Sequence, residues 1–144
     1  MLTNDTAVTL ISDGERVSTK LPEILDMICT DSELIIESYK SKLTTATISS
    51  IRTSDSKDFV YIKTCCDNML MMTPDHKIYL PENKEWVRAE NVSKGLCVLL
   101  SNGTTSEISS THIIADNTVS RVYSLAISPT QCFFANNILV HNEG

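Results

Sequence analysis

The sequence contains no apolar stretch that approaches the length needed to cross a bilayer. Its beginning, MLTNDTAVTL, lacks the basic start and the apolar run of a secretory signal. Internal repeats, low-complexity segments and interdomain linkers are missing as well. These absences predict a chain that neither spans a membrane nor carries an export signal, and they favour a single domain.

Positive charge is scarce and scattered. The chain has 12 Lys and Arg against 18 Asp and Glu, which gives a net charge of -6 at pH 7. Binding to nucleic acid relies on concentrated positive charge, and no cluster of Lys or Arg is present. We therefore expect no nucleic-acid surface.

The cysteines lack the spacing of a metal or disulfide site. There are five, an odd number, and no two of them form a Cys-x-x-Cys pair. Neither a disulfide framework nor a zinc ribbon is predicted. We expect most of the cysteines to be small core residues. The adjacent pair Cys65 and Cys66 is expected to be structural too, because a disulfide between neighbours is strained.

The sequence does contain a series of short runs rich in Val, Ile, Thr, Tyr and Ser, each bounded by turn residues, as is typical of β-strands. These runs are 8–11, 16–19, 34–39, 44–52, 59–64, 96–100 and 119–127. Gly14 predicts a hairpin after the first run, and Pro22 opens one short helix over 22–28. The polar segment 101–106 is expected to be a loop. A chain of 144 residues with this pattern suits one all-β domain.

A chemically suggestive pair, His141-Asn142, follows the last apolar run. An asparagine can attack its own backbone carbonyl with its side-chain nitrogen, closing a succinimide ring and releasing whatever follows as a free amine. A neighbouring histidine can polarise that carbonyl or deliver a proton to the leaving nitrogen. Taken alone, however, the pair is ordinary sequence, and a solvated tail is the simpler interpretation.

Three segments in a fixed order strengthen the chemical interpretation. They are Met1 to Val8, then Met72 to Gly95 with its Thr73-x-x-His76 and Trp-Val-x-Ala motifs, and last Val122 to Asn142. Together they resemble the Hint superfamily, to which inteins, bacterial intein-like domains and hedgehog autoprocessing domains belong. The resemblance covers essentially the whole chain, and within the first segment Leu2, Asp5, Thr6 and Val8 fit the intein pattern.

This resemblance implies an all-β Hint fold, a horseshoe of many short strands with one or two short helices, in which both chain ends meet in a central cleft. Larger inteins carry a homing endonuclease before their last segment, and the short connection from about Leu100 to Val119 leaves no room for one. We expect a minimal autoprocessing domain over 1–142, followed by flanking residues 143–144. Glu143 cannot act as the second nucleophile of ordinary splicing. That departure resembles the A-type bacterial intein-like domains, which commonly cleave at their ends.

The resemblance also assigns catalytic roles. His76 would hydrogen-bond the nitrogen of the peptide bond upstream of residue 1 and later protonate it, and Thr73 would help to position the same bond. At the other end, His141 would assist the cyclisation of Asn142. The resulting function is protein splicing or self-cleavage of the peptide bonds at both junctions, by a domain that acts once and in cis.

Residue 1 departs from the family pattern. The family uses Cys or Ser there to attack the preceding carbonyl, whereas the thioether of Met1 has no proton to lose and cannot form a thioester. We therefore expect the N-terminal step to be inactive in this chain. Either a start methionine has replaced a cysteine or a natural domain has lost the step. The retained Thr73 and His76 favour the first explanation.

Two further positions differ from the commoner pattern. Many inteins have an aspartate at the position of Ser124 and a histidine at that of Gln131, and both groups normally couple the steps or assist cyclisation. Their replacement predicts slower or looser C-terminal cleavage, although a hydroxyl and an amide can still form hydrogen bonds. Together with Asp5 and Cys132, these residues form the expected supporting set around the site.

Two other functions stay open at this point. One is a non-catalytic all-β module that retains the fold and binds a peptide. The other is a cysteine hydrolase that uses Cys132 and His141, although Cys132 fits a buried strand residue better and no third orienting group is evident.

No metal or cofactor is implied, because a cleft zinc site would be incomplete without a cysteine at residue 1. The resemblance also implies the partners and the location. The partners would be the flanking host segments in cis, with no nucleic acid and no membrane. We expect a monomer, in an intracellular location that follows the host precursor.

Overall fold

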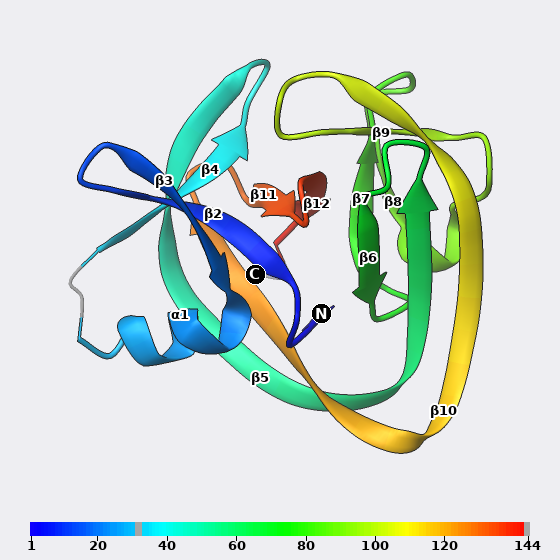
Figure 1. Ribbon diagram of the computed structural model, residues 1–144, viewed down its shortest axis with the longest axis horizontal. Coiled ribbons are helices and arrows are strands. Elements are labelled where there is room, and N and C mark those ends of the chain that lie inside the picture. Colours follow the sequence, from blue (N-terminus) through cyan, green and yellow to red (C-terminus); the bar gives the residue numbers. More distant parts are fainter. Residues whose placement is uncertain (31–32, 143–144) are drawn as a thin grey trace.

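Two long strands organise the molecule. In the computed structural model, which describes residues 1–30 and 33–142 and leaves out the side chains of residues 116 and 117, β5 (Leu43–Thr64) and β10 (Thr105–Ser128) are antiparallel partners over most of their length. The pairing register shifts between Ala115 and Ser120, an irregularity of the kind that bends a β-ribbon. The ribbon curves into a horseshoe, and the remaining strands lie along and inside it (Figure 1).

The other elements are short. In chain order they are β1 (Leu2–Thr3), β2 (Ala7–Ser12), β3 (Glu15–Lys20), α1 (Leu21–Met27), β4 (Leu34–Tyr39), β6 (Met69–Met72), β7 (Lys77–Leu80), β8 (Glu85–Arg88), the 3-10 helix η1 (Ala89–Asn91), β9 (Cys97–Leu99), β11 (Cys132–Ala135) and β12 (Ile138–His141). The described part of the chain forms an eight-stranded sheet, in the order β3-β2-β4-β5-β6-β1-β10-β9, and a four-stranded sheet, in the order β11-β12-β7-β8. The predicted all-β class and the hairpin around Gly14 are confirmed.

Several strand lengths predicted from the sequence were wrong. The predicted runs 44–52 and 59–64 belong to the single strand β5, because the polar residues between them pair with β10 and keep their side chains in solvent. The expected loop 101–106 ends at Thr104, since Thr105 already pairs with Leu99. The segment expected to be a mere connection, from Leu100 to Val119, is largely the first half of β10.

The hydrophobic core fills the space between the two sheets and extends under α1. Leu21 and Ile24 of that helix are buried, and Pro22 lies in its first turn, where a missing N–H is harmless. The helix begins one residue before the predicted start, and within the described residues no helix has the length and apolar character of a membrane span. A smaller cluster of Leu99, Phe134 and Leu139 packs beneath β11 and β12.

The cysteines do not behave as predicted, since only Cys132 is buried. Cys65 and Cys66 lie in the turn after β5 and are exposed, because that turn leaves the sheet. Cys97 is partly exposed, and the pKa of its thiol is raised, first by a hydrogen bond with Glu82 and then by burial. All five are free thiols. Apart from Cys132, the expected core role is therefore wrong.

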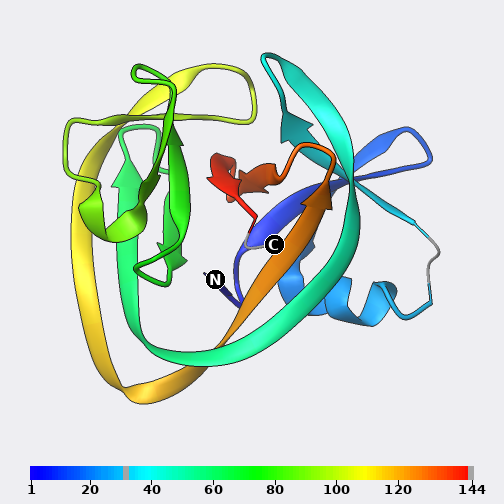
Figure 2. The same cartoon turned by 180° about the vertical axis from the view of Figure 1, so that it is seen from behind.

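Both ends of the described chain lie inside the curve of the horseshoe. Figure 1 shows the start of the chain and β12 between the arms of the ribbon, and the reverse view in Figure 2 shows the same arrangement. The first strand, β1, inserts between β6 and β10, where Leu2 pairs with Met72 on one side and Tyr123 on the other. The last strand, β12, pairs with β7 through Val140 and Ile78. The fold thus brings residues 1 and 142 to one region.

Candidate active site

The turn from Thr73 to His76 presents two side chains to residue 1. Its backbone is fixed on one side by the bond from Thr73 N to the Met1 carbonyl, at 2.8 Å. On the other side, Ala89 N donates to the His76 carbonyl at 2.7 Å and Glu90 N to the Pro74 carbonyl at 3.0 Å. Thr73 and His76 are both buried, with 8% and 1% of their surface exposed. Backbone bonds to Met1 and to η1 thus hold the turn on both sides.

The backbone nitrogen of Met1 lies between the two side chains. As a terminal ammonium in this structure, it donates to Thr73 Oγ1 at 2.5 Å and lies 3.0 Å from His76 Nδ1. Thr73 Oγ1 in turn donates to Asp75 Oδ1 at 2.8 Å. This nitrogen is the atom that would carry a peptide bond to any segment preceding residue 1, so the arrangement aims one hydroxyl and one imidazole at a single amide.

Ser124 lies beside residue 1 on the neighbouring strand. Leu2 pairs with Tyr123 in antiparallel register, and one further step places Met1 opposite Ser124. Ser124 is buried, with 3% of its surface exposed. The side chain expected to support the site is thus on the strand next to residue 1, with a hydroxyl in the place of a carboxylate.

The second half of the site surrounds Asn142, which is itself buried. Its side-chain nitrogen Nδ2 donates to the Ile127 carbonyl at 3.2 Å, and its backbone N–H donates to the Gln131 carbonyl at 2.9 Å. His141 Nδ1 contacts the backbone carbonyl oxygen of Asn142. The side-chain nitrogen that would attack and the carbonyl that would be attacked both belong to Asn142. The imidazole that would polarise this carbonyl belongs to the preceding residue, His141.

His141 is held by an aromatic row. The ring centroids of His141 and Trp86 are 5.0 Å apart at an interplanar angle of 80°, an edge-to-face contact. Trp86 contacts Tyr79 at 5.1 Å, and Tyr79 contacts Tyr39 at 6.3 Å. This row fixes the imidazole on the face of β12 that turns away from the larger core.

Cys132 shares that face with His141, because the two residues pair across β11 and β12. Its thiol nevertheless donates to the Tyr39 carbonyl at 3.2 Å and lies 3.5 Å from Ser38 Oγ. Only 3% of its surface is exposed. This environment is that of a structural cysteine, and it does not prepare a nucleophile.

The two halves of the site share β10. Residue 1 faces Ser124 and the side chain of Asn142 bonds Ile127, so the halves are separated by three residues along one strand, about 10 Å at the usual rise of a strand. Gln131 contributes its backbone carbonyl, while its side chain is exposed. The structure thus places Thr73 and His76 beside residue 1, and His141 and Asn142 beside the next part of the same strand.

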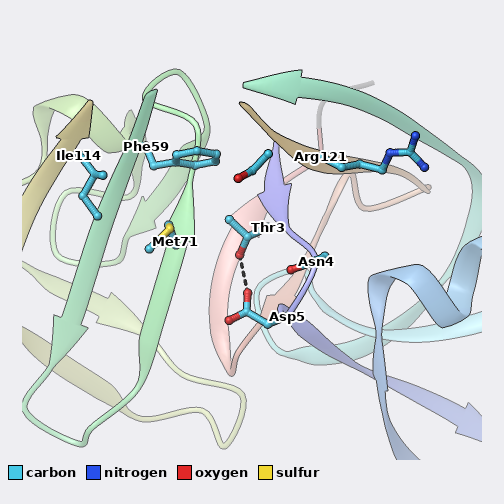
Figure 3. A pocket seen from close by; sticks show the side chains of 8 residues that line it. Thr3, Asn4, Asp5, Phe59, Met71, Ile114 and Arg121 are labelled. Atoms are coloured by element: carbon cyan, nitrogen blue, oxygen red, sulfur yellow. Dashed lines mark hydrogen bonds between the residues drawn. The ribbon is translucent and has the colours of Figure 1, made fainter. Parts of the chain in front are cut away.

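A pocket of about 620 Å³ lies beside β1. Figure 3 shows Thr3, Asn4, Asp5 and Arg121 on one wall, facing Phe59, Met71 and Ile114 on the other. Asp5 accepts a hydrogen bond from Thr3 Oγ1 at 2.6 Å, which ties down the corner between β1 and β2. Thr73, His76, His141 and Asn142 do not line this pocket, and Asp5 contacts Thr3 within the corner of the chain.

Sequence reasoning missed three contributors: the carboxylate of Asp75, the ring of Trp86 and the carbonyl of Ile127. The first two lie inside the motifs Thr-Pro-Asp-His and Trp-Val-x-Ala, which gave their positions without their contacts. The third is a backbone atom and leaves no trace in the residue type. Glu143 lies outside the described residues.

The fold of this chain matches that of solved structures with low sequence identity. An intein from a hyperthermophile superposes with a TM-score of 0.82 at 16% identity, covering 97% of this chain and 98% of that one. A mutant of an Ssp DnaB mini-intein variant superposes with a TM-score of 0.80 at 20% identity, covering 99% and 98%. This chain has the fold of a mini-intein.

A DnaB intein from Synechocystis sp. shows the same mini-intein fold, with a TM-score of 0.73 at 23% identity over 99% of this chain and 98% of the intein. No protein-family model and no curated protein matches the sequence. The predicted Hint horseshoe is confirmed by these superpositions.

Proposed function

We propose that this chain is an intein-like self-processing domain, formed by residues 1–142, that breaks or rearranges the peptide bonds at its own two junctions. The observation that carries the proposal is the environment of Asn142. Its carbonyl oxygen meets His141 Nδ1, its side-chain nitrogen is oriented by the Ile127 carbonyl, and the residue is shielded from solvent. The mini-intein fold supports the same function.

The C-terminal step follows from these contacts. Nδ2 of Asn142 forms a bond with the carbonyl carbon of its own residue, the bond from that carbon to the nitrogen of residue 143 breaks, and a proton passes from Nδ2 to that nitrogen. His141 Nδ1–H stabilises the charge that develops on the carbonyl oxygen. The products are a succinimide at residue 142 and a free amine on the released segment.

The N-terminal step needs a nucleophile that Met1 does not supply. With a cysteine at residue 1, the thiolate would attack the carbonyl of the preceding residue, and the nitrogen of residue 1 would leave as an amine after taking a proton from His76. Thr73 and His76 already contact this nitrogen. We therefore propose that the N-terminal step is silent with methionine and returns with cysteine, which makes a replaced cysteine the better explanation of Met1.

Glu143 supports cleavage over ordinary splicing, because a carboxylate is a poor acceptor of an acyl group from a thioester. In this respect the chain resembles an A-type bacterial intein-like domain, and its partners would be host segments attached in cis. A peptide-binding module with the same fold would leave both junctions intact.

The test is a fusion that carries one reporter protein before residue 1 and another after residue 144, made with Met1 and with Met1→Cys. We expect the Met1 form to release only the downstream reporter, and the Met1→Cys form to release the upstream reporter as well when dithiothreitol is added. Intact mass spectrometry would identify the succinimide or asparagine end at residue 142. Intact fusions of both forms after prolonged incubation at mildly acidic and neutral pH would reject the proposal.

A further inference from the structure

The hydroxyl of Thr73 takes part in two contacts, and only one proton is available to it. It receives a hydrogen bond from the nitrogen of Met1 at 2.5 Å and gives its own hydrogen to Asp75 Oδ1 at 2.8 Å. A hydroxyl has a single hydrogen and two acceptor lone pairs. While Asp75 accepts that hydrogen, Thr73 can act toward the nitrogen of residue 1 only as an acceptor.

This constraint determines what His76 can do. In the structure the nitrogen of residue 1 is an ammonium, which has hydrogens for both Thr73 and His76. When a segment precedes residue 1, the same nitrogen belongs to a peptide bond and carries one hydrogen, which Thr73 in this position would accept. His76 Nδ1 lies 3.0 Å from the same nitrogen, so a hydrogen between these two atoms would then have to come from the imidazole. The contact of Thr73 with Asp75 thus favours the His76 state that holds a proton on Nδ1, which is the state able to protonate the leaving nitrogen.

We propose that Asp75 is a positioning residue for the N-terminal step, and that it acts through the hydroxyl of Thr73 by fixing that hydroxyl as the acceptor of the scissile N–H. The side-chain hydrogen bond of Asp75 seen in the described residues is the one with Thr73, so we expect its effect to reach the reaction through that hydroxyl. The inference rests on the proposed function and adds the direction of the hydrogen bonds at one junction.

The geometry distinguishes this positioning role of Asp75 from a general effect of its negative charge on the site. Asp75 is exposed, whereas Thr73 and His76 are buried. Its contact with Thr73 is local, two residues away, and the backbone of the turn is held independently by bonds to Met1 and η1. Removing the carboxylate should therefore leave the turn in place and release only the hydroxyl, which can then rotate and offer its hydrogen to the wrong atom.

The experiment uses the fusion with Met1→Cys and measures the rate of thiol-induced release of the upstream reporter. Asp75→Ala should slow this release about tenfold, because a charge-assisted hydrogen bond that orients the reactive hydroxyl is lost. Asp75→Asn should stay within about threefold of the parent, because its amide oxygen still accepts from Thr73. Asp26→Ala, on an exposed face of α1, is the matched control and should leave the rate unchanged.

A double-mutant cycle with Thr73→Val tests whether Asp75 acts through the hydroxyl of Thr73. Valine keeps the shape of threonine without the hydroxyl, so Asp75→Ala should have no further effect in that background. Release of the downstream reporter through Asn142 should not change in any of these variants, which also shows that they fold.

Equal losses in Asp75→Asn and Asp75→Ala, or a full tenfold loss from Asp75→Ala on top of Thr73→Val, would overturn the inference. An unchanged rate in Asp75→Ala would do the same. These outcomes differ from failure of the proposed function, in which the Met1→Cys parent itself would release neither reporter.

Discussion

The two junction sites lie about 10 Å apart on β10, yet they are built in different ways. At residue 1 the reacting bond is approached by side chains from a turn, and the nucleophile would come from a two-residue strand. At residue 142 the nucleophile, the carbonyl and its polarising histidine come from two consecutive residues, and two backbone carbonyls orient them. The N-terminal site depends on distant parts of the chain, whereas the chemical groups of the C-terminal site are local.

Because of this difference, one half could lose its chemistry without any change in the other, as the proposed function requires. Methionine at residue 1 offers no thiol, yet Thr73 and His76 are in place, because backbone bonds to Met1 and to η1 hold their turn. The second site shares no side chain with the first among the contacts described above. If the two sites are independent, a substitution in one should change the cleavage rate at that junction alone. The following variants test that independence.

The largest effect is expected from Asn142→Ala. Without the side-chain amide no succinimide can form, so release of the downstream reporter should stop, while thiol-induced release in the Met1→Cys form should persist. Intact mass spectrometry of both released reporters checks this. Asn91→Ala, an exposed residue of η1, is the control. Loss of both steps in Asn142→Ala would show that the sites are coupled.

A smaller loss is expected from His141→Ala. The variant removes the donor at the Asn142 carbonyl, and loss of one such donor typically slows an acyl-transfer step about hundredfold. The rate of C-terminal cleavage is measured by the appearance of the downstream reporter. His112→Ala serves for comparison, because His112 is exposed on β10 and stacks on Tyr61, far from both junctions in the pairing register. An unchanged rate in His141→Ala would remove this histidine from the mechanism.

Trp86→Ala should slow C-terminal cleavage by about three- to tenfold, the equivalent of one lost edge-to-face contact. The imidazole of His141 would then sample orientations in which Nδ1 no longer faces the carbonyl. Trp86→Phe keeps an aromatic ring and should recover most of the rate. Upstream release from the Met1→Cys form should not change, and a matching loss there would point to a general defect in folding.

The smallest effect is expected from Cys132→Ala. Both cleavage rates should stay within about twofold, and the free energy of unfolding should fall by about 1 kcal/mol, because a buried thiol that donates one hydrogen bond is removed. Chemical denaturation measures the second quantity. A large loss of either cleavage step would revive Cys132 as a nucleophile and would break the assignment of chemistry to the two junctions.

Several features of this protein follow from local sequence and were predicted correctly. The hairpin around Gly14, the strand at 34–39 and the helix near Pro22 each depend on neighbouring residues alone. The long strands β5 and β10 do not, because their polar middle sections have weak strand preference and are kept extended by pairing with each other. The bend of the horseshoe was predicted only from the family resemblance, because local sequence does not reveal a register shift between two segments far apart in the chain.

The same distinction between local and long-range features applies to the candidate site. Asn142, His141, Thr73 and His76 were predicted from motifs, because each belongs to a short pattern with recognisable chemistry, and their catalytic roles stay a prediction. The contact of Trp86 with His141 and the bond from Asn142 to the Ile127 carbonyl join separate strands, so the residue types gave no indication of them. The link from Thr73 to Asp75 is local, but its direction becomes evident only when the Met1 nitrogen is present as the other partner.

The sequence by itself determined which reactions the atoms allow: an asparagine that can cyclise, a histidine beside it, and a thioether where a thiol would be needed. These properties belong to single residues and are the same in any fold. Only the tertiary structure decided that residue 1 meets a turn 72 positions away, and that Asn142 meets a carbonyl 15 positions before it. Such meetings depend on strand pairing across the whole chain, because proximity in a β-fold is set by register between distant segments.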